Sequence, residues 1–219
     1  MSAKKLQLLV DADVLIKLAV FDCFVDCLKA CGFDMADAAT LQSMRLSAGL
    51  HKPQVRERKA GSAAAAARLL ALLHAIPYID NQTKDEEKLA ATMVHTSQRM
   101  GLSVDGGEAL LLSICITRGV PYLTTGDKRA VRELPALAEV LPELNAAKGR
   151  VVPIDRLLLG LAQHEGIGKV VSRIQGTAEE GDRGWRRRLE RAAFSPKRFG
   201  QSLHAQLEEL RTQAGGFVG

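Results

Sequence analysis

Short apolar runs, each followed by a longer stretch with helical periodicity, constrain the fold of this chain most. The segment LQLLVD (6–11) is an almost continuous apolar run that ends in an acid, as expected of a strand buried on both faces of a parallel sheet. Because strands alternate with helices, the sequence predicts an α/β fold with a central parallel sheet. The other expected strands lie in FDMADAATL (33–41), IPYID (76–80), PYLTT (121–125) and VVPI (151–154).

The stretches between these strands carry helix signals. Asp13 is expected to cap a helix that begins at Val14, continues through Leu28 and ends at Gly32. The Thr83-x-x-Glu86 pair predicts a capping box for a helix over 84–100. Another helix is expected to start near Asp127. Pro135 is expected to interrupt it, and a separate short helix is expected to follow. The remaining expected helices cover 41–50, the alanine-rich 62–75, 106–118, 155–163 and 195–214.

Two domains are predicted: residues 1–165 as the α/β domain and residues 166–219 as a basic helical extension. Beyond residue 165 isolated glycines and weak periodicity replace the earlier pattern. The net charge of the whole chain is +5, and the segment 183–198 alone contributes 7 − 1 = +6. Its seven basic residues, set against Glu190, are Arg183, Arg186, Arg187, Arg188, Arg191, Lys197 and Arg198.

Composition narrows the class of protein. The 219 residues are 47% hydrophobic and 25% charged, which excludes wholesale disorder and suits a globular chain. No apolar run reaches the length of a membrane span, and the N-terminal run is too short for a secretory signal. The cysteines at 23, 27, 31 and 115 are interpreted as small buried residues in a reducing compartment. A cytoplasmic protein without membrane contact is therefore expected.

Four acidic residues stand at positions that suit a shared site. Asp11 ends the first expected strand, and Asp127 follows the strand PYLTT closely. Asp105 and Glu108 begin the helix in between. Ligands of parallel α/β sheets gather at the carboxyl ends of the strands. Taken singly, acids such as Asp105, Glu108 and Asp127 are more often helix caps than ligands, so only their combination indicates a site.

Carboxylates brought together in this way need a cation. Their mutual repulsion raises their pKa values unless a positive ion lies between them. Hard oxygen ligands favour Mg²⁺ or Mn²⁺, ions that typically activate water for attack on phosphate esters. The pattern therefore predicts a divalent-metal site that cuts nucleic acid. A small-molecule α/β enzyme that uses the same strand ends is a further hypothesis without a motif behind it.

The motifs VDADVLIKLA, VDGGEALLL and LTTGDKRAV, in this order, resemble the three acidic motifs of PIN-domain ribonucleases over roughly residues 6–155. The resemblance implies a three-layer α/β/α sandwich and metal-dependent cleavage of RNA. It implies direct metal binding by Asp11 and Asp127, and a role for Asp105 and Glu108 in binding the metal or orienting water. Asp105 is grouped with the metal ligands, and Thr125 is expected beside the cluster.

The sequence departs from that family pattern at one position. Gln42 or Ser43 stands where a glutamate is expected after the second strand. Either metal affinity is weaker than in the family, or Asp13 or Asp37 completes the site. A PIN-like module without catalysis, which binds nucleic acid or protein, is therefore the alternative. Members of the family often form dimers, and some are held by a partner protein. A homodimer, an antitoxin partner in a toxin–antitoxin pair, or an RNA-processing role follows from the resemblance.

Basic residues are the candidates for contact with nucleic acid. Lys128 and Arg129 follow Asp127 directly, and Trp185 precedes Arg186, Arg187 and Arg188. Arginine suits phosphate and an exposed indole suits stacking on bases. The alternative interpretation is a solvated charged helix face that the tryptophan anchors to the domain.

Overall fold

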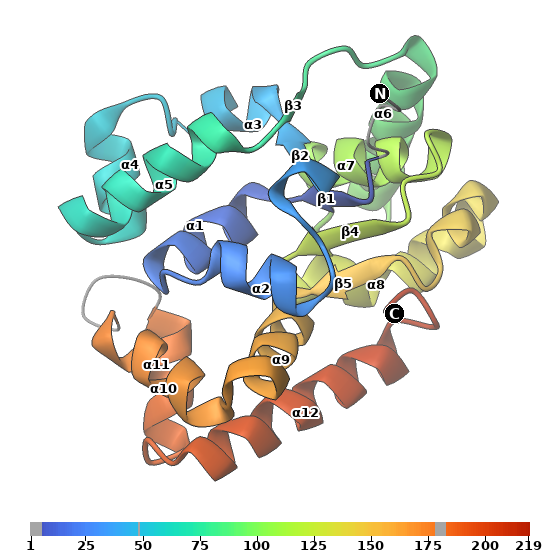
Figure 1. The fold of residues 1–219 in the computed structure, drawn as a ribbon. Helices are drawn as coiled ribbons and strands as arrows, with labels where there is room; N and C mark the ends of the chain where they lie inside the picture. The colour runs from blue at the N-terminus through green and yellow to red at the C-terminus, as the bar shows by residue number, and fades with distance from the viewer. Residues whose placement is uncertain (1–5, 48, 178–182) are drawn as a thin grey trace.

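The computed structural model describes residues 6–47, 49–177 and 183–219. In this part of the chain five strands form one sheet, in the order β3-β2-β1-β4-β5, and every pair is parallel. The predicted α/β class with a central parallel sheet flanked by helices is confirmed (Figure 1). The strands are β1 (Leu8–Val10), β2 (Ala38–Leu41), β3 (Tyr78–Ile79), β4 (Tyr122–Thr125) and β5 (Val151–Pro153).

Helices make up most of the described chain. Among the described residues, none of them combines the length and apolar character that crossing a membrane requires. They are α1 (Ala12–Val20), α2 (Phe24–Ala30), η1 (Met35–Asp37), α3 (Gln42–Ser47), α4 (Pro53–Ala60), α5 (Ala63–Ala75), α6 (Lys84–Arg99), α7 (Gly106–Thr117), α8 (Lys128–Val140), η2 (Pro142–Ala147), α9 (Ile154–Glu165), α10 (Ile167–Gly176), α11 (Arg183–Arg191) and α12 (Pro196–Gln213).

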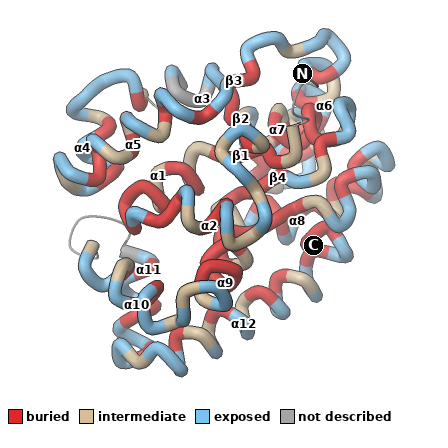
Figure 2. Tube along the Cα trace, viewed as in Figure 1, coloured by how far each residue is buried: buried red, intermediate tan, exposed pale blue. Residues whose placement is uncertain are grey.

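The middle of the sheet fixes where a site can form. All three residues of β1 are fully buried, which explains their unbroken apolar sequence (Figure 2). Strand β1 pairs with β2 on one side and β4 on the other, so the strand order changes direction along the chain at this point. In the register with β4, Val10 lies opposite Thr124. The residues just beyond both strands are therefore neighbours at the sheet's carboxyl edge.

The first predicted helix is two helices, which corrects the expectation of one helix from Val14 to Gly32. Helix α1 ends at Val20, and α2 starts at Phe24 after a turn in which Asp22 has φ 50°. The turn lets α2 pack against α9. The cap is also corrected, because Asp11 occupies the N-cap position of α1 and Asp13 lies in its first turn.

Pro135 does not interrupt α8, which corrects a second expectation. The helix continues through it to Val140, and the segment after it forms the 3₁₀ helix η2. Leu134 and Leu137 on either side of Pro135 are buried in the core, and this packing offsets the hydrogen bond that proline cannot donate. By contrast, the capping box between Thr83 and Glu86 is confirmed at the start of α6.

The C-terminal helices pack on the rest of the molecule. Helix α12 lies along α8 and α9 (Figure 1), and Phe199 and Phe217 are fully buried in the same hydrophobic core as the sheet. After α12 the chain returns to the sheet, where Val218 forms a parallel bridge with Val151 of β5. Residues 167–176, whose periodicity looked weak, form α10 with Val170, Val171 and Ile174 buried.

Candidate functional site: an acidic cleft

One cleft at the carboxyl edge of the sheet collects the predicted acids. It has a volume of about 770 Å³ and is lined by Asp11, Asp105, Glu108 and Asp127. These residues come from the end of β1, the start of α7 and the start of α8. Asp13 also lines the cleft. The four acids named from sequence, with Asp13, are thus brought to one place, which is called the acidic cleft below.

Asp11 is the most deeply placed of these acids. It follows β1, and its backbone N–H donates to the carbonyl of Thr124 at 3.1 Å, which continues the pairing of β1 with β4. Its side chain is 7% exposed, and the hydroxyl of Thr125 donates to its Oδ2 at 3.4 Å. Pairing of two neighbouring strands therefore holds the Asp11 carboxylate beside Thr125.

Asp105 and Glu108 form a reciprocal cap on α7. The backbone N–H of Glu108 donates to Asp105 Oδ1 at 2.8 Å, and that of Asp105 donates to Glu108 Oε2 at 3.3 Å. At the other end of α7, Arg118 forms an ion pair with α6: its Nε lies 2.6 Å from Oε1 of the buried Glu86. These contacts fix the helix that presents both acids, so a capping role and a place in the cleft coexist.

Asp127 caps α8 from the loop after β4. Its Oδ1 accepts from the backbone N–H groups of Arg129 and Ala130, at 2.7 and 3.2 Å. Its own N–H donates to the hydroxyl of Thr125 at 3.1 Å. Thr125 therefore contacts both strand-end acids, since it donates to Asp11 and accepts from Asp127.

The acids repel one another. Burial and the nearby charges of Asp13 and Asp105 raise the pKa of Asp11 to about 6. Burial raises the pKa of Glu108 to about 8, with further contributions from the charges of Asp105, Asp127 and Asp11. Each shift shows that the cleft disfavours the accumulated negative charge.

Protein cations do not offset this charge at three of the acids. Among the described residues, no lysine or arginine forms an ion pair with Asp11, Asp105 or Glu108. Clustered carboxylate oxygens are the donor set that Mg²⁺ and Mn²⁺ prefer. The donor chemistry thus fits a hard divalent cation. Within the described ranges, no group of three acidic, histidine or cysteine side chains is already arranged to hold a metal ion.

Two lysines in the cleft were not singled out from sequence. Lys17 of α1 and Lys59 of α4 both line it. Lys17 Nζ lies 2.6 Å from Asp13 Oδ2, an i,i+4 pair that the spacing in α1 signals in retrospect. Lys59 comes from a helix far away in sequence, and no local pattern connects it with the acids.

Gly126 lets Asp13 approach the loop after β4. A Cβ at this position would lie 2.0 Å from Asp13 Oδ2 and 3.3 Å from Lys17 Nζ. The missing side chain therefore leaves room for the Asp13–Lys17 pair between α1 and the loop. This close approach of a carboxylate is a constraint that the sequence alone does not reveal.

Gln42 lies apart from the cleft. It begins α3 directly after β2, at the position where the family pattern expects an acid, and its side chain is exposed. Neither Gln42, Ser43 nor Asp37 is among the residues that line the acidic cleft. Of the supporting residues considered, Asp13 and Thr125 are thus the ones that contact or line this site.

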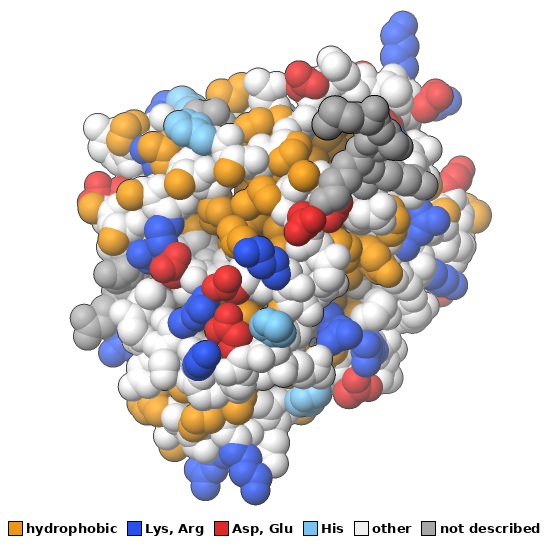
Figure 3. All heavy atoms as spheres, in the orientation of Figure 1, with side chains coloured by type: hydrophobic (Ala, Val, Ile, Leu, Met, Phe, Trp, Pro, Cys, Tyr) orange, Lys and Arg blue, Asp and Glu red, His pale blue; other side chains and the backbone are white. Residues whose placement is uncertain are grey.

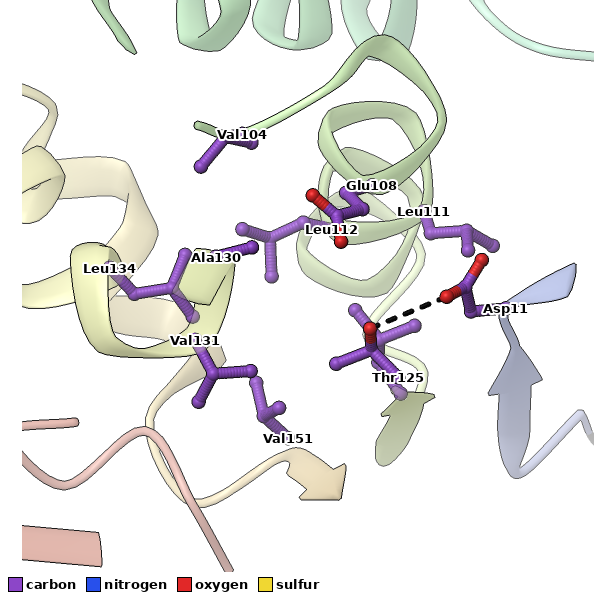
Figure 4. Close-up of a pocket in the computed structure, with 11 residues that line it drawn as sticks. Asp11, Val104, Glu108, Leu111, Leu112, Thr125, Ala130, Val131, Leu134 and Val151 are labelled. Atoms are coloured by element: carbon purple, nitrogen blue, oxygen red, sulfur yellow. Dashed lines mark hydrogen bonds between the residues drawn. The ribbon is translucent and has the colours of Figure 1, made fainter. Parts of the chain in front are cut away.

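A small cavity lies behind the acids. It has a volume of about 30 Å³, enough for one water molecule. Figure 4 shows Asp11, Glu108 and Thr125 on one side of it and Val131, Leu134 and other apolar side chains on the other. The cavity gives the inner face of the acidic cluster an apolar boundary, on the side where Glu108 lies.

The basic candidates divide into two groups. Lys128 and Arg188 turn inward and pair with the buried Asp155, at 2.7 and 2.5 Å. Arg129 is exposed and lies 3.5 Å from Asp127, and Arg186 is exposed and pairs with Glu190. The remaining candidate is Arg187, which is exposed and lines a second groove.

Trp185 is an anchor rather than a stacking platform. It is 6% exposed and packs edge-on against Phe21, with Phe199 and the guanidinium of Arg188 also against its ring. The tryptophan therefore fixes α11 to the domain and is not exposed for stacking on bases. Arg188 is buried with it and is not positioned to contact a ligand at the surface.

The charged side chains on the face in Figure 3 do not form a single-sign patch. Lysines and arginines are interspersed with acids there, and hydrophobic side chains occupy the middle of the view.

Comparison with protein-family models, with curated proteins and with solved structures found no match to this chain. The functional assignment therefore rests on the acidic cleft itself.

Proposed function

We propose that this protein is a metal-dependent endoribonuclease with a PIN-like fold, which hydrolyses RNA phosphodiester bonds in the acidic cleft. The observation that carries the proposal is the meeting of Asp11, Asp105, Glu108 and Asp127 around one cleft. Three of these acids have no ion-pair partner among the described residues, and two have raised pKa values. Such a site favours a divalent cation and, through it, a phosphate.

Asp11, Asp105 and Asp127 are the residues that would hold Mg²⁺ or Mn²⁺. A bound ion supplies an acidified water and neutralises charge on the scissile phosphate. Thr125 holds Asp11 in place, because its hydroxyl donates to that carboxylate. Glu108, with its pKa raised to about 8, is the group suited to hold and pass a proton near neutral pH.

The reaction is a hydrolysis. The oxygen of water forms a bond to phosphorus, and the bond from phosphorus to the leaving sugar oxygen breaks. The proton lost by water ends on the leaving oxygen or in solvent. Lys59 lines the cleft and is suited to bind a phosphate of the substrate. The toxin of a toxin–antitoxin pair and an RNA-processing enzyme are both biological roles compatible with this chemistry.

The direct test is cleavage of a labelled RNA of mixed sequence. Wild-type protein should cleave it with Mg²⁺ or Mn²⁺ and not with EDTA, and Asp105→Asn should lower the rate at least about 100-fold. Asp80→Asn is the matched control, because Asp80 is exposed like Asp105 but does not line the cleft. A rate that is independent of metal, or equal in the two variants, would reject the proposal.

A second candidate is a PIN-like module that binds nucleic acid or protein without cutting. The observation that favours it is the exposed Gln42, where the family pattern expects an acid. RNA binding by the wild-type protein without any metal-dependent cleavage would select this alternative. Metal-dependent cleavage that disappears in Asp105→Asn would reject it.

A further inference from the structure

A second groove adjoins the acidic cleft and is basic. It has a volume of about 420 Å³ and lies between the loop after β4 and α11, with Gln206 of α12 at its border. The two hollows share Lys17 and Gly126 as lining residues, so they lie next to each other there. Among the residues that the structure describes, the charged side chains that line this groove are all lysines or arginines: Lys17, Lys128, Arg187, Arg188 and Arg191.

Arg187 and Arg191 carry the positive charge that is available to a ligand. They are four residues apart, on one face of α11, and both are exposed. Neither forms an ion pair with an acid in the described part of the chain, whereas Lys128 and Arg188 share the single carboxylate of Asp155. The groove thus presents two guanidinium groups, which suit phosphate oxygens.

The ordered attachment of α11 supports this geometry. Trp185 and Leu189 are buried in the core, and Arg188 Nη2 donates to the backbone carbonyl of Ser202 at 2.8 Å. The helix is therefore fixed with its 187/191 face toward the groove rather than turned to solvent at random. Because Trp185 is enclosed, no aromatic face of α11 remains for stacking on bases.

We propose that this groove binds the backbone of single-stranded RNA through Arg187 and Arg191 and directs the strand past Gly126 into the acidic cleft. The inference rests on the proposed function, since it names the path of the same substrate. The groove, with about 420 Å³, and the cleft, with about 770 Å³, have the volumes of small-molecule binding sites, and such volumes suit a strand one nucleotide wide. Contacts to phosphate alone make the binding independent of base sequence.

The test is fluorescence anisotropy with a labelled single-stranded RNA of mixed sequence, in EDTA, where the metal-free cleft repels phosphate and the signal reports the groove. Arg187→Ala with Arg191→Ala should weaken binding at least about tenfold. It should also reduce the magnitude of the slope of log K, where K is the RNA association constant, against the logarithm of the salt concentration. The expected reduction is about 1.4, because each of the two lost phosphate contacts contributes about 0.7. Thermal melts verify that this exposed pair leaves the fold intact.

The matched control is Lys197→Ala with Arg198→Ala, which removes two exposed charges near the start of α12 that do not line the groove. Its affinity and salt slope should stay close to wild type. Equal losses in both double variants would mean that only net charge matters, and no loss in the Arg187/Arg191 variant would mean that the groove is not used. Either result would overturn the inference.

Cleavage assays separate this inference from the proposed function. Groove-dependent binding without cleavage would leave the inference standing and remove only the nuclease. Cleavage by a protein whose RNA affinity does not depend on Arg187 and Arg191 would remove only the groove. A duplex RNA of the same sequence should bind more weakly, and equal affinity would overturn the single-strand assignment.

Discussion

At the scale of single residues, some acids of the acidic cleft cap helices as well as lining the cleft. Asp105 and Asp127 each place one oxygen on a helix N-terminus, where the carboxylate satisfies free N–H groups. Asp11 is an N-cap by position, yet its side chain makes no such cap. Capping therefore explains Asp105, Glu108 and Asp127 and leaves the buried Asp11 unexplained by local structure.

Glu108→Gln tests whether burial, together with the charges of the neighbouring acids, raises the pKa of Glu108. In the folded chain the pKa of Glu108 is raised from 4.5 to about 8, so the folded state retains a proton that the unfolded state has released. Its contribution to the free energy of unfolding is therefore fully present below about pH 4.5 and is lost as the pH rises toward about 8. Chemical unfolding in EDTA across this range should show a smaller decline for Glu108→Gln than for wild type.

The exposed Glu87, on α6, provides the control for this pH series. Glu87→Gln should keep the pH dependence of the wild-type protein. If Glu108→Gln and Glu87→Gln both reproduce the wild-type curve, the pKa of the Glu108 carboxyl group is not raised in the folded protein.

Gly126→Ala tests the approach of Asp13 to the loop after β4. The new methyl would overlap Asp13 Oδ2 and displace the Asp13–Lys17 pair. Since the displaced atoms end a flexible side chain, stability should change by less than about 1 kcal/mol. The Mn²⁺ affinity should fall about tenfold, as for a residue next to metal ligands. Gly106→Ala is the control, because no atom lies within 4 Å of its new Cβ. Equal affinities in the two variants would contradict the account.

At the scale of elements, the buried Asp155 connects three helices. It lies at the start of α9, is 1% exposed and pairs with Lys128 of α8 and Arg188 of α11. Lys128 directly follows Asp127 and also donates to Gln206 of α12 at 2.6 Å. The C-terminal helices thus hold the segment that carries one acid of the cleft.

Asp155→Asn should destabilise the protein by about 3–5 kcal/mol, since it leaves two largely enclosed cations without their counter-charge. Urea unfolding monitored by circular dichroism measures this difference. The control is Glu190→Gln, which breaks the exposed pair with Arg186 and should cost about 0.5 kcal/mol or less. A loss in Asp155→Asn as small as in the control would show that the cluster contributes little.

Elements were predictable where local signals agreed with packing. The apolar run of β1 and the capping box of α6 were both read correctly from sequence. Errors occurred where tertiary contacts overrode local rules. Asp22 breaks an otherwise continuous helical pattern so that α2 can reach α9, and Pro135 is retained because its neighbours are buried.

In the site too, some residues were predictable from local sequence and others depended on long-range packing. The acids at strand ends were predictable because the carboxyl edge of a parallel sheet brings them together. Lys59 was not predictable, because it reaches the site through long-range packing. The sequence marks Arg187 as a candidate for nucleic acid, but only the fold shows that Arg187 and Arg191 line a groove beside the cleft. Arg188 and Lys128 look like surface residues in the sequence, and only the fold reveals their shared buried partner.

At the scale of the whole molecule, residues 166–219 share a core with the sheet. Phe199 and Phe217 are buried in it, and Val218 bridges β5. The intact chain should therefore unfold in one calorimetric transition, and a fragment of residues 1–165 should lack a cooperative transition. A fragment that melts cooperatively close to the full-length temperature would instead support two independent domains.

The central claim is that Asp11, Asp105 and Asp127 bind one divalent cation, and calorimetric titration with Mn²⁺ tests it most directly. Wild-type protein should bind about one ion per chain, as should the Asp80→Asn control. Asp11→Asn with Asp127→Asn should weaken binding at least about 100-fold, because two of the proposed carboxylate ligands are removed. Unchanged Mn²⁺ binding in the double variant, with its fold verified by circular dichroism, would contradict the assignment of the metal site.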